Sequence, residues 1–165
     1  MAIELRPYGD DDLALTEALE SDVEVMRGLG GVAGKGESAR IHARRLAGMA
    51  RGDWYFTIHV DEGARAAGII AIWQTPWDGG FIHEVGAMLL PEFHAQGIAM
   101  RAFRILAERG RAEAKFTEIH AFTEVHNEPS NAIVRRLGFT LLEECDVDYE
   151  GRPLHCNHWV QQADS

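Results

Sequence analysis

The chain has 165 residues, of which 46% are hydrophobic and 25% are charged, a composition typical of a soluble globular protein. Its formal net charge of −10 argues against nucleic acid as the main partner, because phosphate binding requires basic stripes. No apolar run approaches the roughly 20 residues of a membrane span, and the N-terminus lacks a signal-peptide pattern, so we expect one cytoplasmic domain over residues 1–165 and no membrane partner.

The negative charge suits a cationic acceptor such as an amine, although an acidic surface can equally serve solubility alone. Two cysteines, Cys145 and Cys156, are too few for a disulfide framework, and we expect both to be reduced. The histidines at 83, 120 and 126 are scattered and lack metal-ligand spacing, so no metal is expected.

The first third of the chain predicts a strand followed by two helices. Residues 2–8 alternate as a strand does, and Asp10–Asp12 offer an N-cap and an acidic first turn for the first helix. Gly28–Gly36 contains five glycines but lacks the Gly-Lys-Ser/Thr ending of a phosphate loop, so it predicts a flexible connection. Ser38 can cap the second helix, which runs to about Arg51.

Three strands are predicted next. Residues 54–60 alternate, and residues 66–73 are apolar throughout, as in a central strand that is covered on both faces. Residues 74–80 contain proline, aspartate and two glycines, which is turn chemistry. The third strand spans residues 81–90 and is stopped by Pro91.

The last part of the chain begins with a helix that starts near Gly97, carries an apolar stripe and has Gly110 as its expected stop. A strand, a short helix and the two strands of a hairpin follow, at residues 118–124, 129–137, 141–149 and 153–160. This order of elements indicates an α/β (α+β) fold in which helices cover both faces of a mixed sheet.

The closing hairpin has a predicted register. A two-residue turn at Glu150-Gly151 places directly opposed residues across the ladder. The expected pairs are Val147 with Leu154, Leu141 with Val160, Glu143 with His158, Asp146 with His155 and Cys145 with Cys156. The two thiols are therefore expected to be neighbours, either as small core residues or as a pair that oxidation can bridge.

The most informative segment runs from Glu84 to Ala99, where a strand enters a short turn and a helix begins at Gly97. The first amides of such a helix lack partners within it, and its dipole makes this end positive, so it can hold a pyrophosphate. Gly97 lets a phosphate approach the backbone without meeting a Cβ atom. The segment therefore predicts an anion site at the start of the helix.

Together with a downstream run, this segment resembles the GCN5-related N-acetyltransferase (GNAT) superfamily, and most closely its ribosomal-protein N-terminal acetyltransferase-like branch. The run His94–Ala99 is similar to the family motif Gln/Arg-x-x-Gly-x-Gly/Ala, with His in the first place. The run Asn127–Phe139 is similar to the family's Asn-x-x-Ser/Ala…Leu-Gly-Phe segment. The resemblance covers roughly residues 81–160 and implies a mostly antiparallel central sheet.

The resemblance also implies acetyl-CoA as the co-substrate. The end of the preceding strand would pair with the pantetheine arm, the helix-start amides would hold the pyrophosphate, and two asparagines would lie beside the pantetheine or adenosine end. The cofactor-binding residues expected on this basis are Met88, Leu89, Leu90, His94, Gln96, Gly97, Ile98, Ala99, Met100, Arg101, Asn127 and Asn131.

Attack of an amine on a thioester requires a base for the ammonium proton and a donor for the departing thiolate. Glu84 lies among apolar neighbours on its strand face, and such surroundings tend to raise the pKa of a carboxyl group, which suits a base. The alternative is a solvated or salt-bridged carboxylate. If Glu84 is not the base, Asp148 or a water chain is the next candidate. Val134 stands where many family members have a tyrosine acid. The resemblance assigns the proton donor to Ser130, which could instead cap its own short helix.

The leading interpretation is an N-acetyltransferase acting on a primary amine of a small molecule or a protein N-terminus. The alternatives are a catalytically inactive acyl-CoA-binding sensor and a nucleotide-binding regulatory protein. Trp77, in a polar turn, favours a pocket or partner contact, whereas Trp54 and Trp73 are expected in the core. The identity of the amine and the presence of a homodimer are left open.

Overall fold

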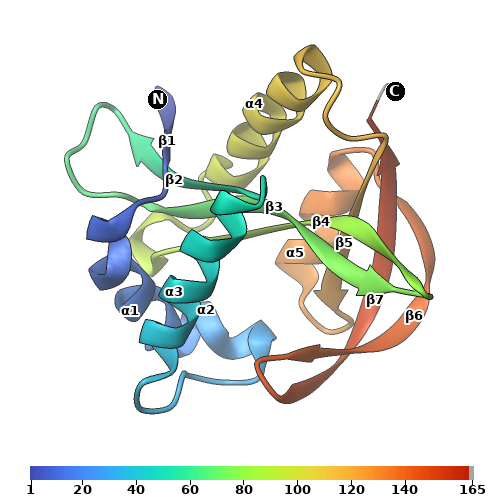
Figure 1. The fold of residues 1–165 in the computed structure, drawn as a ribbon, viewed down its shortest axis with the longest axis horizontal. Helices are drawn as coiled ribbons and strands as arrows, with labels where there is room; N and C mark the ends of the chain where they lie inside the picture. The colour runs from blue at the N-terminus through green and yellow to red at the C-terminus, as the bar shows by residue number, and fades with distance from the viewer. Residues whose placement is uncertain (164–165) are drawn as a thin grey trace.

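The computed structural model describes residues 1–163 and contains a seven-stranded sheet with the strand order β1-β2-β3-β4-β5-β7-β6 (Figure 1). All neighbouring strands are antiparallel except β4 and β5, which run parallel. The strands are β1 (Ile3–Pro7), β2 (Trp54–Val60), β3 (Gly68–Trp77), β4 (Gly80–Leu89), β5 (Glu118–Glu124), β6 (Thr140–Tyr149) and β7 (Arg152–Gln162).

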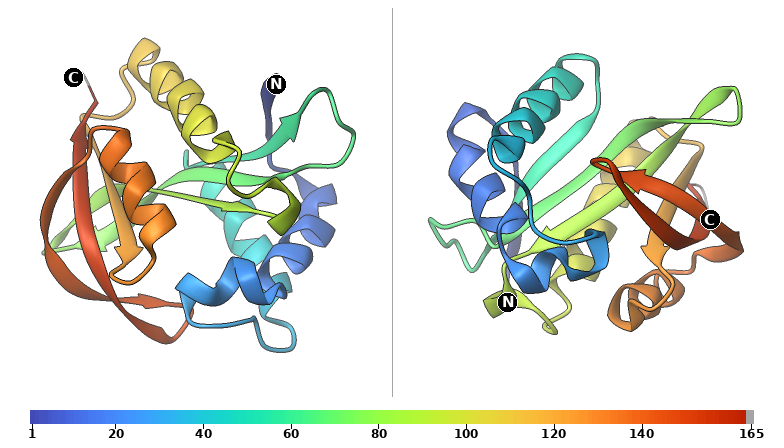
Figure 2. Two further views of the ribbon diagram at one scale, coloured as in Figure 1. Left: turned by 180° about the vertical axis from the view of Figure 1, so that it is seen from behind. Right: turned by 90° about the horizontal axis from the view of Figure 1, so that it is seen from below.

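Helices cover both faces of this sheet (Figures 1 and 2). The α-helices are α1 (Leu13–Glu20), α2 (Val23–Met26), α3 (Glu37–Ala50), α4 (Ile98–Ala112) and α5 (Glu128–Arg136), with short 3-10 turns η1 (Asp10–Asp12), η2 (Arg27–Leu29) and η3 (Pro91–Phe93). The first three α-helices lie on one face, and α4 and α5 lie on the other. The predicted α/β class, with a mixed, mostly antiparallel sheet between two helical layers, is confirmed.

Two apolar clusters occupy the two faces. The larger joins α4, α5 and the sheet through side chains that include Leu106, Phe116 and Trp159, with Trp54 packed against it. The smaller lies beneath α1 and α3 and includes Tyr8, Leu19 and Ile69, with Met88 packed against it. Successive residues of a strand point to opposite faces, so Met88 and Glu84 both face the α1–α3 side.

The segment between the first strand and α3 is more structured than predicted. The short helix α2 and the turn η2 lie between α1 and the glycine-rich connection. Ser38 does not cap α3, because the helix starts one residue earlier and its N-cap is Gly36, with a φ of 78°. In place of a capping hydroxyl, the Glu37 carboxylate accepts a 2.6 Å hydrogen bond from the Gly34 amide.

The predicted turn at residues 74–80 is wrong in extent, because β3 continues to Trp77 and only Asp78 and Gly79 form the turn. Pro76 is compatible with the strand because β2 pairs with β3 only as far as Ile72. Beyond that point the outer edge of β3 has no neighbouring strand within residues 1–163, so a missing N–H costs no ladder hydrogen bond there.

Gly110 is not the end of α4, as its sequence position predicted. The helix continues to Ala112, and Gly110 is buried. A Cβ atom there would lie 2.9 Å from Cδ2 of Phe116, so the glycine makes room for an aromatic ring. Within residues 1–163, neither α4 nor any other helix is long and apolar enough to cross a membrane.

The register of the closing hairpin is confirmed in its outer part. Four of the predicted pairs form as expected: Val147 with Leu154, Asp146 with His155, Cys145 with Cys156 and Glu143 with His158. The prediction for Leu141 is wrong, because a bulge between Leu141 and Glu143 places Leu141 opposite Trp159. Glu150 and Gly151 both have positive φ angles, 51° and 80°, as a tight two-residue hairpin turn requires.

Candidate active site

Strand β4 has one fully paired edge and one partly free edge. β3 pairs with it along its whole length, whereas the parallel pairing with β5 is limited to Glu84 opposite His120. Within residues 1–163 the β5-facing edge of β4 beyond Glu84 therefore has no partner strand. Met88 and Leu89 lie along this edge, where an extended ligand such as the expected pantetheine arm can pair with the strand. The Leu90 amide is not free for such pairing, because it donates to the Ala67 carbonyl at 2.9 Å.

The helix α4 begins directly after this strand and its turn. Gly97 is the N-cap, with a φ of 76°, and no side chain caps the helix. A Cβ atom at Gly97 would meet no heavy atom within 4 Å, so the space beside the backbone is open. The Arg101 amide donates to the Gly97 carbonyl at 3.2 Å, which leaves the amides of Ile98, Ala99 and Met100 as the free donors. Of the predicted backbone contacts, that of Arg101 is thus already used within the helix.

The side chains of His94 and Gln96 stabilise the turn before α4. His94 Nε2 lies 2.7 Å from the Leu89 carbonyl oxygen, and Gln96 Nε2 donates to the Glu92 carbonyl at 2.9 Å. Both side chains are exposed. They fasten the turn that carries Gly97, so any direct contact of these residues with a ligand would have to come from their backbone or from rearranged side chains.

Asn131 and Asn127 fix the start of α5. Asn131 is 2% exposed, and its amide group donates to the carbonyls of Glu124 and Val125 and accepts from Thr123 and Asn157. The Asn127 side chain accepts a hydrogen bond from the Ser130 amide at 3.3 Å. Asn131 therefore positions the end of β5 against α5, and its side chain has no further donor to offer a cofactor.

Ser130 does not cap α5, because the N-cap of this helix is Asn127. Ser130 lies within the first turn, is partly buried, and its hydroxyl has no hydrogen-bond partner among residues 1–163. The capping alternative for Ser130 is therefore wrong, and its hydroxyl is available to a ligand.

A cavity of about 420 Å³ lies between β3, β4, β5 and the closing hairpin. Four carboxylates line it, from Glu84, Glu124, Asp146 and Asp148, and no lysine or arginine does. The other lining residues are Gly28, Leu29, Thr75, Pro76, Trp77, Phe122, Val147, Tyr149, Leu154 and Cys156. The cavity combines negative charge with aromatic walls, a combination that suits a cation. Trp77 lies in its wall, as expected from its place in the sequence.

Glu84 stands in the wall of this cavity. Burial raises the pKa of its carboxyl group to about 7, while a 2.8 Å hydrogen bond from the Thr75 hydroxyl acts in the opposite direction. No ion pair within residues 1–163 involves Glu84. The salt-bridged alternative is thus wrong, and the raised pKa expected from its apolar neighbours is present.

The closing hairpin is held over the cavity by contacts with the helical layer. The Tyr149 hydroxyl donates a 2.8 Å hydrogen bond to Glu20, which is fully buried, and Arg152 pairs with Glu37 at 2.8 Å. Arg44 pairs with Glu150 at the tip. Burial raises the pKa values of both Tyr149 and Glu20. These contacts join residues more than a hundred positions apart and keep the Tyr149 ring in the cavity wall.

The expected site residues thus fall into a group at the start of α4 and a cavity group that contains Glu84 and Asp148. Sequence reasoning missed Thr75, Glu124, Asp146 and Tyr149, whose positions in the cavity depend on strand order and on the hairpin docking. No local motif marks them. Within residues 1–163, no group of three or more His, Cys, Asp or Glu side chains could hold a metal ion.

Comparison with solved structures identifies the fold. The chain is similar to an acetyltransferase from Salmonella typhimurium that modifies the N-terminal serine of ribosomal protein L7/L12, with 19% identity, a TM-score of 0.77, and 98% and 95% of the two chains covered. It is also similar to a spermidine N-acetyltransferase from Vibrio cholerae in complex with CoA and spermine, with 13% identity, a TM-score of 0.78, and 98% and 96% covered.

A third similar structure is a phosphinothricin acetyltransferase from Sinorhizobium meliloti in complex with acetyl-CoA, with 21% identity, a TM-score of 0.79, and 98% and 89% of the two chains covered. These three neighbours act on three different acceptors, so the shared fold does not decide the acceptor. No curated protein matches the sequence significantly.

The family model described as an acetyltransferase (GNAT) domain matches residues 2–140, which is most of the chain. Complexes with acetyl-CoA or CoA among the structural neighbours agree with acetyl-CoA as the donor in this family. The chain therefore belongs to the GNAT acetyltransferase family, and the acetyl-CoA-dependent enzyme class expected from its sequence is confirmed.

Proposed function

We propose that this protein transfers the acetyl group of acetyl-CoA to a primary amine of a small molecule or a protein N-terminus. The observation that carries the proposal is Glu84, a carboxyl group with a pKa of about 7 in the wall of an acidic cavity. Glu84 lies on β4, whose far end has the free edge and is followed by the glycine start of α4. Strand β4 thus joins the amine-binding cavity to the cofactor-binding edge. We also propose that the protein is a single domain that acts in the cytoplasm.

The start of α4 fits the phosphate end of acetyl-CoA. Ile98, Ala99 and Met100 offer free amides, and the absence of a Cβ atom at Gly97 leaves the approach open. The edge of β4 at Met88 and Leu89 faces no strand among residues 1–163 and is open to the amide groups of the pantetheine arm, whereas the Leu90 amide already donates to the Ala67 carbonyl. When bound, acetyl-CoA supplies an activated acetyl thioester.

The cavity attracts and deprotonates the acceptor. Its carboxylates favour an ammonium group at the entrance, and Glu84, ionised in about half of the molecules near neutral pH, accepts one proton from that group. The resulting neutral amine has the lone pair that forms the new nitrogen–carbon bond. Holding the amine beside the free edge of β4 supplies much of the rate through proximity.

Two donors of this chain stabilise the charges that develop as the carbon–sulfur bond breaks. A backbone amide near Met88 or Leu89 donates to the thioester oxygen. Ser130, whose hydroxyl is unpaired among residues 1–163, donates to the departing thiolate. The nitrogen loses its second proton as the amide forms, and that proton ends on the departing sulfur by way of the Ser130 hydroxyl, so the products are the amide and the free thiol of CoA. The first proton, held by Glu84, returns to solvent.

A thiol-release assay with acetyl-CoA and a panel of amines tests this function. Di- and polyamines, amino acids, and peptides with different N-termini should be included, because the acidic cavity favours a cationic acceptor. Release of free CoA with at least one amine, reduced in Glu84→Gln, is the expected result. Cofactor binding without thiol release from any amine would instead identify the catalytically inactive sensor.

A further inference from the structure

Two buried histidines on neighbouring strands contact each other beside the acidic cavity. His120 on β5 is 6% exposed, His158 on β7 is 3% exposed, and Nδ1 of His120 lies 2.8 Å from Nε2 of His158. Nε2 of His120 lies 2.7 Å from a carboxylate oxygen of Glu118, which is partly exposed. The three side chains therefore form one chain of hydrogen bonds across β5 and β7, which are neighbours in the sheet (Figure 1).

The carboxylate fixes the direction of this chain. The hydrogen bond from His120 lowers the pKa of Glu118, so at neutral pH its carboxylate is ionised and can only accept. Nε2 of His120 therefore carries a hydrogen, and in the neutral ring its Nδ1 is an acceptor. Nε2 of His158 is then the donor between the two rings, and Nδ1 of His158 holds a lone pair. The contacts thus select one tautomer for each ring.

This Nδ1 atom of His158 is buried and has no hydrogen-bond partner among residues 1–163. Oε1 of Glu143 lies 4.0 Å from it, which is too far for a hydrogen bond. Glu143 is opposite His158 because of the bulge in β6 between Leu141 and Glu143. The bulge therefore places a carboxylate beside the one nitrogen of the two rings that can take up a proton.

One added proton turns this nitrogen into a donor in either arrangement of the hydrogens. If the charge stays on His158, its Nδ1 carries the proton. If the Nε2 hydrogen of His158 moves to Nδ1 of His120 in response, Nδ1 of His158 still carries a hydrogen. Burial lowers the pKa of His158, and the charge of His120 acts in the same direction. Three carboxylates favour the charged form: Glu143 on β6, Asp78 in the β3–β4 turn and Glu118 on β5.

His158 also supports the wall of the acidic cavity. Its ring is stacked on that of Phe122, with centroids 4.4 Å apart and planes 19° apart, and it lies edge-on to Trp77 with centroids 5.1 Å apart. Phe122 and Trp77 contact each other and both line the cavity. The register of β5 and β7 pairs Phe122 directly with His158, which fixes the stack. A charge on His158 is therefore separated from the cavity by one aromatic layer.

We propose that His158 is a positioning residue that sets the affinity of the acidic cavity for its cationic acceptor, an inference that rests on the proposed function. When the histidine pair is neutral, the His158 ring holds Phe122 and Trp77 in the wall and adds no positive charge. When the pair takes up a proton, its charge lies behind this wall and repels an ammonium group in the cavity. The affinity should then fall by roughly threefold to tenfold, because nearby carboxylates offset part of the repulsion.

Nitrogen NMR of the imidazole rings tests the proton site without an acceptor. At about pH 8 the Nδ1 atom of His158 should be unprotonated, and acid should protonate it. The indole N–H signal of Trp77, assigned with Trp77→Phe, should shift with the same midpoint. Glu143→Gln should lower this midpoint by roughly half a pH unit, because the imidazolium loses a carboxylate. Glu144→Gln is the matched control, since the two side chains are 61% and 62% exposed and point to opposite sides of β6, and it should leave the midpoint unchanged.

The KM of the best amine found, measured from about pH 5 to 8, tests the effect on the acceptor. In the wild type KM should rise below the NMR midpoint, and kcat should change less. Glu143→Gln should move this rise to lower pH together with the midpoint. His158→Phe keeps a stacked ring without a titrating group, so its KM at about pH 8 should stay near that of the wild type and this rise should be absent. Glu84 is the same in all of these proteins, so its own titration cancels in the comparison.

Tetramethylammonium, whose charge does not depend on pH, gives the same comparison without acetyl transfer. Its binding, followed by the Trp77 signal, should weaken on proton uptake in the wild type and not in His158→Phe. If no amine is acetylated but this difference is found, the proposed function fails and the role of His158 stands. A hydrogen on Nδ1 of His158 at about pH 8, or cation binding with the same pH dependence in the wild type, Glu143→Gln and His158→Phe, would overturn the proposal.

Discussion

The Thr75 hydroxyl on β3 donates a 2.8 Å hydrogen bond to Oε1 of Glu84 on β4, in the wall of the acidic cavity. This bond favours the carboxylate and lowers the pKa of Glu84, which burial raises to about 7. Thr75→Val should therefore raise that pKa and move the acidic limb of the pH–rate profile to higher pH by about one unit. Thr75→Ser keeps the hydroxyl and should have the wild-type profile. An unchanged profile in Thr75→Val would show that the Thr75 hydrogen bond does not control the pKa of the catalytic base.

Glu84→Gln should lower turnover by roughly 100- to 10,000-fold at neutral pH, the range of positioned general bases, with partial recovery at higher pH where more amine is already neutral. The measurement is a pH–rate profile with the best acceptor found. Wild-type turnover across the range would place the base elsewhere, with Asp148 in the same cavity as the next candidate.

The same substitution has an expected effect on stability that requires no acceptor. The pKa of Glu84 is raised from 4.5 to about 7 on folding, so the folded state holds its proton more tightly than the unfolded state. The contribution of Glu84 to stability is fully present below pH 4.5 and is lost as the pH rises through 7. Glu84→Gln should therefore gain stability relative to the wild type between pH 4.5 and 8, as measured by urea unfolding. A pH-independent difference would contradict the raised pKa.

Gly97→Val should abolish the rise in melting temperature that acetyl-CoA causes in the wild type, because a side chain would occupy the open approach to the first amides of α4. A left-handed backbone also makes this substitution costly by roughly 1–2 kcal/mol. Gly79→Val is the matched control, since Gly79 has a φ of 79° and equally open space in a distant turn. It should lose similar stability and keep the acetyl-CoA effect. Unchanged acetyl-CoA binding in Gly97→Val would make the assignment of this turn wrong.

Ser130→Ala and Asn127→Ala should separate proton donation from helix capping. Asn127 caps α5, so Asn127→Ala should lower the free energy of unfolding by about 1 kcal/mol. Ser130 has no hydroxyl partner among residues 1–163, so Ser130→Ala should leave stability within about 0.5 kcal/mol of the wild type and lower turnover at all pH values. Loss of acetyl-CoA binding in Ser130→Ala would leave the proton donor unidentified.

Cys145 and Cys156 lie directly opposite each other on β6 and β7, and both are free thiols. Burial raises the pKa of both, that of Cys156 to about 12, so few thiolates exist at neutral pH. We expect glutathione disulfide to oxidise the two thiols slowly to one intramolecular disulfide, with the loss of two hydrogen atoms from the protein. The reaction should be faster at higher pH, and the mass of the intact protein measures it. Cys145→Ser should prevent it. Because Cys156 lines the cavity, the disulfide should also change turnover. If no disulfide forms under any oxidising condition, the prediction of a bridge is wrong.

Local patterns in the sequence were sufficient for the elements that carry the candidate cofactor site. The strand ending at Leu89, the glycine start of α4 and the hairpin turn at Glu150-Gly151 all follow from rules that act over a few residues. Predictions failed where side-chain packing or a strand irregularity decides the outcome. Gly110 has the sequence position of a helix stop, but the Phe116 ring occupies the space that a side chain would need, and Leu141 changes partner because of a bulge.

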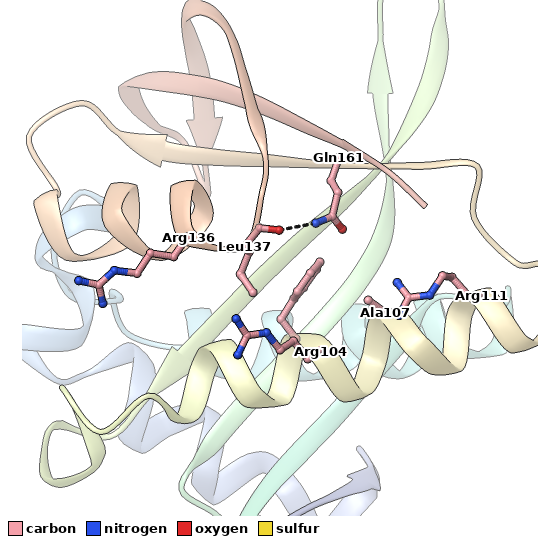
Figure 3. A pocket seen from close by; sticks show the side chains of 7 residues that line it. Arg104, Ala107, Arg111, Arg136, Leu137 and Gln161 are labelled. Atoms are coloured by element: carbon pink, nitrogen blue, oxygen red, sulfur yellow. Dashed lines mark hydrogen bonds between the residues drawn. The ribbon is translucent and has the colours of Figure 1, made fainter. Parts of the chain in front are cut away.

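The sequence by itself therefore determined the fold class, the family and the glycine start of α4 in this protein. Only the tertiary structure decided the cavity, because its wall combines β3, β4 and β5 with a hairpin that Tyr149 attaches to Glu20. It likewise decided the small cavity between α4 and α5 that Arg104, Arg111 and Arg136 line (Figure 3). The physical reason is that periodicity and turn chemistry act between near neighbours in the chain, whereas burial, charge clustering and the raised pKa of Glu84 depend on residues that only folding brings together.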